Sequence, residues 1–145
     1  MGFGLEKSLE RTLTILKPDS VSAGKAGAIL AHLEKEGFRF IALRRMRLSP
    51  EQAKAFYAVH RERPFYDALV RFMTEGPVVV AALERADAVA HLRRTMGATD
   101  SRKAEPGSVR NLFGTDIERN AIHGSDSKEN AAKEIAFFFS DAELV

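Results

Sequence analysis

The order of strand-like and helix-like segments predicts an α+β fold: a ferredoxin-like four-stranded antiparallel sheet (βαββαβ) with an inserted helical hairpin and a C-terminal helix. Three observations support this prediction. Alternating hydrophobic patterns and helical periodicity follow one another along the chain. A continuous apolar run at residues 78–83 is typical of a central strand that is buried on both faces. The 145 residues, 45% of them hydrophobic, are enough for one domain, so we expect a single domain over residues 1–145.

Four segments have the patterns of strands. Residues 11–16 alternate Thr with aliphatic side chains, as a half-buried strand does. The second strand is predicted over residues 38–48, and one of its faces is expected to carry Phe38, Phe40 and Ala42. The third and fourth strands are predicted at residues 78–83 and 117–122. A doubly wound parallel sheet is the alternative, but that fold usually has a helix between all consecutive strands and a Gly-rich first turn.

The first helices are marked by the residues that begin and end them. Ser22 is predicted to begin the first helix and Gly37 to end it. After the second strand, Ser49 and the proline that follows it predict the start of a helical hairpin. Pro64 breaks this hairpin, and its second helix is predicted at about residues 66–74.

The second half of the chain contains two more predicted helices and a long loop. Asp87 is predicted to cap a helix that Gly97 ends. Residues 98–114 are rich in Gly, Pro, Ser and charged residues, which predicts a long loop of the kind that often carries function. Asp126 and Glu129 have the spacing of a capping box, which predicts the start of the last helix.

Composition and charge exclude several kinds of site. The chain has no cysteine, which excludes disulfides, thiolate nucleophiles and cysteine-based metal sites. A net charge of +2 does not by itself indicate a nucleic-acid-binding protein. The longest apolar run is far shorter than a membrane span. The N-terminal segment MGFGLEKSLE has neither a secretory-signal nor a myristoylation pattern, so we expect a cytoplasmic protein without a membrane partner.

His123 is the histidine with the clearest chemical context. The other three histidines, His32, His60 and His91, lie in helical patterns and are predicted to be ordinary surface or half-buried residues. His123 lies in the segment NAIHGSDS, just before a predicted helix whose N–H groups and dipole favour a nearby anion. A neutral imidazole there is a competent nucleophile towards phosphorus. From the residues alone, a turn histidine followed by helix-capping residues is an equally good interpretation.

This segment resembles the active-site signature of nucleoside diphosphate kinases, Asn-x-x-His-Gly-Ser-Asp. Other motifs of that family occur in the same order, so the resemblance covers about residues 10–145. They are TILKPDSV from Thr14, Tyr57 with the later Arg63-Pro64-Phe65, Gly76-Pro77-Val78, Gly97-Ala-Thr99-Asp100, Pro106-Gly107-Ser-Val-Arg110 and Lys133-Glu134-Ile135.

The resemblance implies a role for each matching position. In that family the residue that matches His123 is the phosphorylated nucleophile, and Ser125 and Glu134 match the residues that support and orient it. The phosphates are bound at the positions of Lys17, Tyr57, Arg93, Thr99 and Arg110. The ribose is contacted at the positions of Lys17 and Asn120, and the base is sandwiched at those of Phe65 and Ile117. Three of these residues, Lys17, Arg93 and Arg110, are cations from distant segments, and they suit the negative charge that a phosphoryl group carries during transfer.

The activity that follows from the resemblance is phosphoryl transfer between nucleotides. The enzyme is expected to move the γ-phosphate of a nucleoside triphosphate to a nucleoside diphosphate by a ping-pong route through phosphohistidine, which maintains nucleoside triphosphate pools. The resemblance implies Mg²⁺ that arrives with the nucleotide phosphates, and no protein metal site. Ser101 stands where many relatives have Pro, in a loop that relatives use in subunit contacts. Because the chain ends at Val145, whereas longer members of the family continue for several residues, we expect a homotetramer or a homodimer rather than a hexamer.

Two other classes of function are weaker alternatives. Ferredoxin-like sheets also bind single-stranded nucleic acid through aromatic side chains, but only Phe38 and Phe40 are available for that here, so no nucleic acid is expected to be required. A phosphatase or phosphodiesterase could use the same histidine as its nucleophile, and it would release free phosphate to water.

Overall fold

The computed structural model describes residues 8–145. The predictions about a secretory signal and a myristoylation site concern mainly residues 1–7, which lie outside this part. The strands are β1 (Leu9–Leu16), β2 (Arg39–Met46), β3 (Val78–Ala86) and β4 (Ile122–Gly124), in the spatial order β2-β3-β1-β4. Every pairing is antiparallel. The predicted ferredoxin-like sheet is therefore confirmed, and the doubly wound parallel sheet is excluded.

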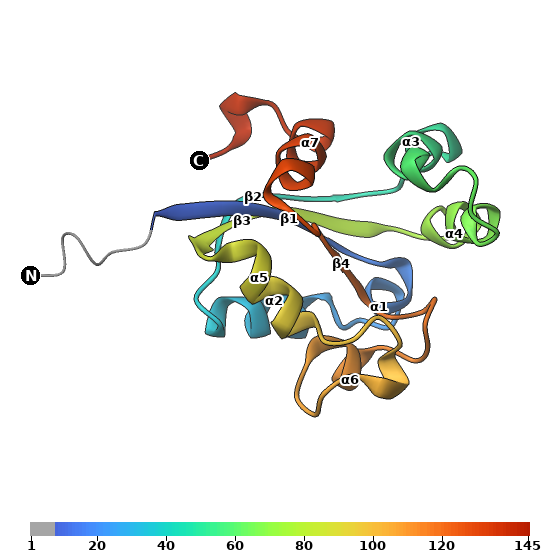
Figure 1. The fold of residues 1–145 in the computed structure, drawn as a ribbon, viewed down its shortest axis with the longest axis horizontal. Helices are drawn as coiled ribbons and strands as arrows, with labels where there is room; N and C mark the ends of the chain where they lie inside the picture. The colour runs from blue at the N-terminus through green and yellow to red at the C-terminus, as the bar shows by residue number, and fades with distance from the viewer. Residues whose placement is uncertain (1–7) are drawn as a thin grey trace, which may run out of the picture.

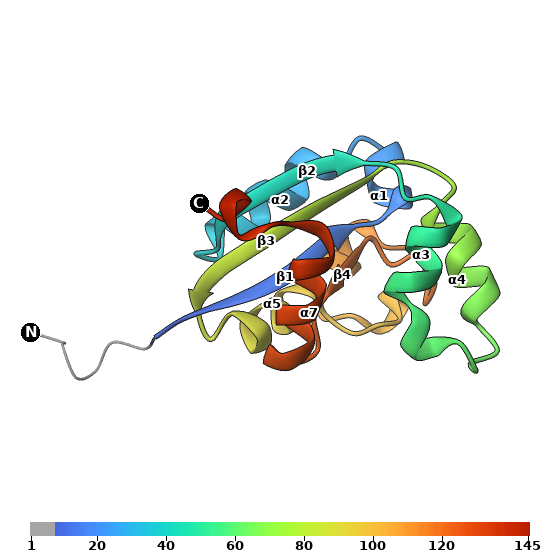
Figure 2. The same cartoon turned by 90° about the horizontal axis from the view of Figure 1, so that it is seen from above.

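The helices cover both faces and one end of the sheet (Figures 1 and 2). Their bounds are α1 (Pro18–Ser22), α2 (Ala26–Lys35), α3 (Pro50–Phe56), α4 (Tyr66–Met73), α5 (Ala88–Met96), α6 (Val109–Phe113) and α7 (Lys128–Phe138), with 3₁₀ turns at Ala58–His60, Ser101–Lys103 and Asp141–Glu143. In Figure 1, α7 lies on one face, α2 and α5 lie on the other, and the α3–α4 hairpin lies at one end of the sheet. Within residues 8–145, every helix is too short or too polar to cross a bilayer.

The hydrophobic core has two parts, one on each face of the sheet. On β3, the side chains of Val78, Val80 and Ala82 pack on the face of α7, whereas the intervening residues pack against α2 and α5. This alternation confirms the prediction that this strand is buried on both faces. Strand β2 differs from the prediction because a bulge lies between Phe40 and Ala42, so these two side chains join different parts of the core.

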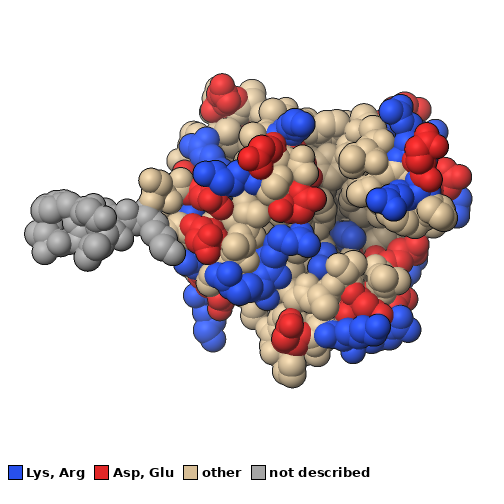
Figure 3. Space-filling model, in the orientation of Figure 1, with Lys and Arg blue, Asp and Glu red and all other residues tan. Residues whose placement is uncertain are grey.

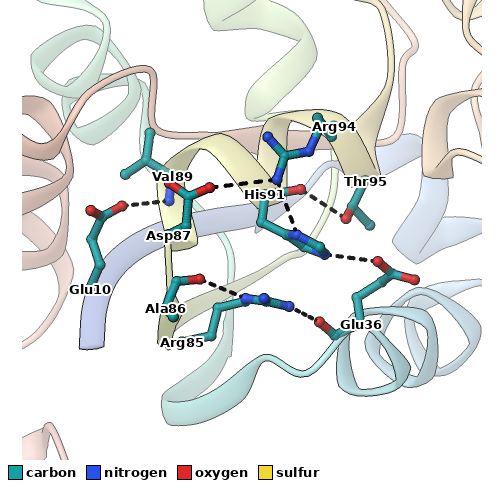
Figure 4. Close-up of polar contacts among 9 residues, drawn as sticks. All are labelled: Glu10, Glu36, Arg85, Ala86, Asp87, Val89, His91, Arg94 and Thr95. Carbon is teal, nitrogen blue, oxygen red and sulfur yellow. Dashed lines mark hydrogen bonds and ion pairs between the residues drawn. The ribbon is translucent and has the colours of Figure 1, made fainter. Parts of the chain in front are cut away.

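Polar contacts fasten α5 to its surroundings (Figure 4). A carboxylate oxygen of Glu10 in β1 accepts from the Val89 backbone N–H at 2.9 Å, in the first turn of the helix. His91 Nε2 contacts Glu36 Oε1, just after α2, at 2.9 Å. These contacts fix the helix that carries Arg93. His32, His60 and His91 are partly buried, as the sequence predicts for ordinary histidines.

Several predicted boundaries are wrong in the first half and the loop. Ser22 ends the short helix α1 instead of beginning the long helix, which starts at Ala26 after a turn with Gly24 at φ +75°. Asp87 precedes α5, but its side chain caps no backbone N–H, and its φ is +55°. The predicted loop at 98–114 contains a 3₁₀ turn and helix α6.

Two further corrections lie beside His123. The fourth strand is Ile122–Gly124 and not residues 117–122, because a tight turn at Ala121 separates the preceding residues from the sheet. The last helix is capped by Ser127, whose Oγ accepts from the Asn130 N–H at 3.1 Å, so Asp126 is not the N-cap.

Candidate active site

His123 lies in the middle of β4, opposite Ile15 of β1. Its backbone carbonyl accepts from the Thr14 hydroxyl at 2.8 Å, which ties the residue to the central strands. The imidazole is 20% exposed. Its ring makes edge contacts with two aromatic rings, and the distance between ring centroids is 5.4 Å to Phe56 and 6.4 Å to Tyr57. The ring therefore packs against two aromatic rings and still reaches solvent in part.

A chain of hydrogen bonds determines which nitrogen of the imidazole carries the proton. The Leu13 backbone N–H donates to Ser125 Oγ at 3.2 Å, so the hydroxyl proton is available to Glu134 Oε1, 2.7 Å away. The same carboxylate oxygen lies 2.9 Å from His123 Nε2. A carboxylate only accepts, so Nε2 carries a proton and donates it. The neutral ring then has its lone pair on Nδ1.

Gly124 brings this strand close to helix α5. A Cβ at position 124 would lie 2.7 Å from Met96 Sδ and 2.9 Å from Leu92 Cδ2. The glycine is needed because β4 packs directly on α5. This close packing sets the depth of His123 in the molecule.

Lys17 and Asn120 meet where β1 leads into α1. Lys17 Nζ donates to Asn120 Oδ1 at 2.8 Å, and the Asn120 amide donates to the carbonyls of Thr99 at 2.9 Å and Ile117 at 3.2 Å. The lysine is 8% exposed. Burial, and then the Arg110 guanidinium, lower the pKa of Lys17 to about 8. A bound anion would relieve this unfavourable charge.

Arg110 projects from α6 towards the same region. Its guanidinium donates to the carbonyls of Gly97 at 3.1 Å and Ile122 at 2.8 Å, and within residues 8–145 its Nε has no partner. Burial, and then the charge of Arg93, lower the pKa of Arg110 to about 10. Neither Lys17 nor Arg110 forms an ion pair with a carboxylate in the described part of the chain. The site therefore carries excess positive charge.

A cavity of about 730 Å³ joins several of these groups. Six of the predicted site residues line it: Tyr57, Arg93, Thr99, Arg110, His123 and Glu134. It is also lined by residues that the sequence analysis did not assign to the site, among them Phe56, Val59, His60, Asp126, Asn130, Lys133 and Phe137. Figure 3 shows a hollow between α7 and the α3–α4 hairpin, with Lys or Arg atoms at its floor.

The remaining predicted residues do not line this cavity. Lys17, Asn120 and Ser125 are buried. Phe65 is 49% exposed and Ile117 is 61% exposed, and neither lines the cavity. At this exposure Phe65 is not a residue of the hydrophobic core. Its ring lies 5.4 Å from that of His60, which does line the cavity.

Tyr57 has a buried hydroxyl that has no partner within residues 8–145. Burial, and then the charge of Glu134, raise the pKa of Tyr57 well above its ordinary value, so the phenol stays protonated. An unpaired buried O–H is costly and suits a ligand that brings an acceptor.

Sequence reasoning missed the residues that support the site from behind. Thr14 was noted as part of an alternating strand and of a family motif but was given no role, and Leu13 acts through its backbone, which no sequence pattern reveals. Phe56 had a weak signal in its position on the helical stripe of Ala53 and Tyr57.

Among residues 8–145 there is no group of three or more His, Asp or Glu side chains that could hold a metal ion.

Comparisons with known proteins agree with this geometry. The family model described as nucleoside diphosphate kinase matches residues 10–144. The nucleoside diphosphate kinase of Acidiphilium cryptum is 56% identical over 136 residues, which cover 94% of this chain and 97% of that protein.

Two solved structures are also similar. A crystal structure of the Aquifex aeolicus nucleoside diphosphate kinase has 52% identity and a TM-score of 0.93, over 95% of this chain and 100% of that one. The structure of a halophilic nucleoside diphosphate kinase from Halobacterium salinarum in complex with CDP has 44% identity and a TM-score of 0.91, over 95% and 92% of the chains. With its sheet order, its oriented histidine and its cationic cavity, this chain belongs to the nucleoside diphosphate kinase family.

Proposed function

We propose that Nδ1 of His123 is the atom that carries the phosphoryl group in this enzyme. The activity itself is that of the family, the transfer of the terminal phosphoryl group from a nucleoside triphosphate to a nucleoside diphosphate. The observation that carries the proposal is the contact of Nε2 with Glu134 Oε1 at 2.9 Å, because it leaves the lone pair on the other nitrogen.

The reaction then has two in-line steps. Nδ1 attacks the γ-phosphorus, a nitrogen–phosphorus bond forms, and the bond to the β,γ-bridging oxygen breaks, which releases the nucleoside diphosphate. In the second step a terminal oxygen of another diphosphate attacks the same phosphorus and frees Nδ1. The Nε2 proton remains on the ring throughout, and Glu134 stabilises the positive charge of the ring in the intermediate.

Phosphate binding is assigned to the basic and hydroxyl groups of the cavity. Lys17, Arg93 and Arg110 supply charge, and Arg forks suit bidentate capture of phosphate oxygens. Thr99 and Tyr57 supply hydroxyl groups. Support comes from the lowered pKa values of Lys17 and Arg110, which an anionic ligand would raise. Catalysis of phosphoryl transfer rests mainly on such positioning and charge stabilisation.

The sugar is assigned to two buried residues and the base to two exposed ones. Lys17 and Asn120 bind the ribose, and the base lies between Phe65 and Ile117. Both apolar side chains are about half exposed or more, so they are free to receive a ring. Stacking accepts every base because each has a π-face. The complex of the Halobacterium salinarum enzyme with CDP supports a nucleoside diphosphate as the ligand.

A divalent metal accompanies the nucleotides in this family, and we propose that it is Mg²⁺. The cavity is lined by three cations, Arg93, Arg110 and Lys133, and by two carboxylates, Asp126 and Glu134, so its net charge suits phosphate oxygens better than a free metal ion. When bound with the nucleotide, Mg²⁺ would neutralise part of the charge of the phosphates. No residue is assigned to hold the ion itself.

Assembly, domain organisation and location are proposed from the sequence. We propose a single domain over residues 1–145, a homotetramer or homodimer, and a cytoplasmic location without a nucleic-acid partner. Light scattering at micromolar concentration tests the assembly. A tetramer or dimer supports the proposal, and a monomer or hexamer contradicts it.

Labelling with γ-³²P-ATP and Mg²⁺ tests the proposed nucleophile. The purified protein should take up acid-labile, base-stable label, and ADP should remove it rapidly. His123→Ala should take up none, whereas the control His32→Ala should label normally because His32 lies on α2 away from the cavity. Label in His123→Ala would contradict the proposal. Rapid loss of label to water without ADP would indicate a hydrolase.

A further inference from the structure

We propose that Asp19 is a positioning residue for phosphoryl transfer: it stabilises the strained turn at Ala121, and this turn keeps Asn120 in contact with Lys17 beside His123. The inference rests on the proposed roles of Lys17 and Asn120 in binding the nucleotide. It concerns a residue that does not line the cavity.

Ala121 is the centre of an unusual turn. Its φ is +73°, and the Ile122 N–H donates to the Asn120 carbonyl at 2.9 Å across it. A bond from residue i+2 to residue i around a positive φ defines a classic γ-turn, which is rare and strained. A positive φ is unfavourable for a residue that has a Cβ. Ala121 is fully buried, so surrounding groups must stabilise this conformation.

The segment after β1 supplies those groups. Asp19 Oδ2 accepts from the Ala121 N–H at 3.1 Å. The Ala121 carbonyl accepts from the Lys17 N–H at 2.9 Å and from the Ser20 hydroxyl at 2.8 Å. Both polar groups of the strained residue are therefore bound by three residues of the segment 17–20. Asp19 is the side chain that binds its N–H.

The turn places functional groups on both of its sides. Asn120 precedes it, and the Asn120 Oδ1 contact with Lys17 Nζ at 2.8 Å spans 103 positions in sequence. Ile122 and His123 follow it in β4. A change of direction at Ala121 would move the amide of Asn120 relative to the imidazole. Misplacement by about 1 Å is enough to cost a large factor in rate.

The charge of Asp19 also affects the protonation of Lys17. Its negative charge raises the pKa of Lys17, against burial and Arg110, which lower it; Glu118 acts in the same sense as Asp19. Burial raises the pKa of Asp19 itself, and Oδ1 is buried with no partner within residues 8–145. Arg119, which pairs with Glu75 at 2.8 Å, is the other cation that Asp19 affects. Asp19 thus helps to keep Lys17 charged as well as placed.

Two substitutions separate these effects. Asp19→Asn keeps an oxygen that can accept from the Ala121 N–H but removes the charge, whereas Asp19→Ala removes both. The matched control is Glu51→Gln, an exposed carboxylate in the first turn of α3. Steady-state kinetics with ATP and a nucleoside diphosphate, over pH 6–10, give kcat and KM for each variant.

We expect Asp19→Ala to lower kcat about tenfold or more, with a smaller change in KM, and Glu51→Gln to match the parent protein. In Asp19→Asn the basic limb of kcat/KM should move to lower pH, because Lys17 loses a neighbouring negative charge. Adding Ala121→Gly to Asp19→Ala should restore part of kcat, because glycine adopts a positive φ without the penalty. Parental kcat in Asp19→Ala overturns the inference. An equal loss at every pH with no rescue by glycine also overturns it.

Lys17→Met, measured in parallel, separates this inference from the proposed function. If Lys17→Met retains parental kcat, the proposed role of Lys17 is wrong. If Lys17→Met is impaired and Asp19→Ala and Asp19→Asn behave like the parent, only the role of Asp19 is wrong. Asp19→Asn is nearly isosteric, so it supplies this comparison even if the alanine variant does not fold.

Discussion

Replacing Lys17 by Met should make the protein more stable and much less active. The side chain is 8% exposed, and burial with the Arg110 charge holds its pKa at about 8, against an ordinary value of 10.5. This difference in pKa corresponds to about 3 kcal/mol. Below pH 8, where Lys17 stays protonated in the folded protein, the free energy of unfolding is lower by that amount. Methionine removes the charge but also the hydrogen bond to Asn120, worth about 1 kcal/mol, so the net gain expected at pH 7 is about 2 kcal/mol.

The sign of the pH dependence follows from the direction of the shift. Below pH 8, Lys17 is protonated in both states, and the unfavourable contribution is fully present. Between pH 8 and 10.5, the folded protein releases the proton while the unfolded chain still holds it, so the contribution disappears as pH rises. The stability difference between Lys17→Met and the parent protein should therefore be largest at pH 7 and shrink steadily towards pH 10.

Urea unfolding at pH 7, 8.5 and 10, at one fixed protein concentration, measures this difference. Other titrating groups, such as Tyr57, occur in both proteins and cancel. The same preparation should have lost activity by a factor that corresponds to about 2–4 kcal/mol of transition-state stabilisation. A variant that is less stable than the parent at pH 7, or a difference that does not change with pH, would refute the reasoning.

Three other substitutions test separate parts of the structure. Glu134→Gln should slow phosphoenzyme formation about a hundredfold while the fold remains, measured by rapid-quench labelling; an unchanged rate would show that Nε2 needs no carboxylate. Phe65→Ala should raise KM for ADP, GDP, CDP and UDP alike, by a factor that corresponds to about 1–3 kcal/mol of lost stacking energy. An effect on one base alone would indicate a specific base pocket. Gly124→Ala should lower the free energy of unfolding by about 1–3 kcal/mol, measured in urea, because its Cβ would lie 2.7 Å from Met96 Sδ; unchanged stability would mean that α5 shifts freely.

Local patterns predicted the parts of the fold that local forces determine. The apolar run in β3 and the alternation in β1 led to the correct central strands, and the Ser49–Gln52 capping box of α3 begins where Ser49-Pro50 indicated. The fourth strand was placed too early because the γ-turn at Ala121 depends on Asp19, about a hundred residues away. The bulge in β2 was missed because an extra residue in one strand is defined by its partner strand.

The site could be predicted only as far as the family resemblance extends. The motifs named His123, Lys17 and Asn120, but no spacing in the sequence shows that the lysine and the amide are 2.8 Å apart. The backbone donor of Leu13 and the supporting hydroxyl of Thr14 come from a strand whose sequence pattern indicated only that it is half-buried. Both contacts depend on the register between β1 and β4, which only the folded sheet defines.

The central claim is that the Ser125–Glu134 contacts keep the proton on Nε2 and leave Nδ1 of His123 to take the phosphoryl group. Long-range ¹H–¹⁵N NMR of the protein labelled with ¹⁵N-histidine, before and after phosphorylation by ATP and Mg²⁺, measures this directly. We predict that Nε2 of His123 is protonated in the free enzyme and that ³¹P couples to Nδ1 in the phosphoenzyme. Coupling to Nε2, or phosphorylation of His32, His60 or His91 instead, would contradict the account.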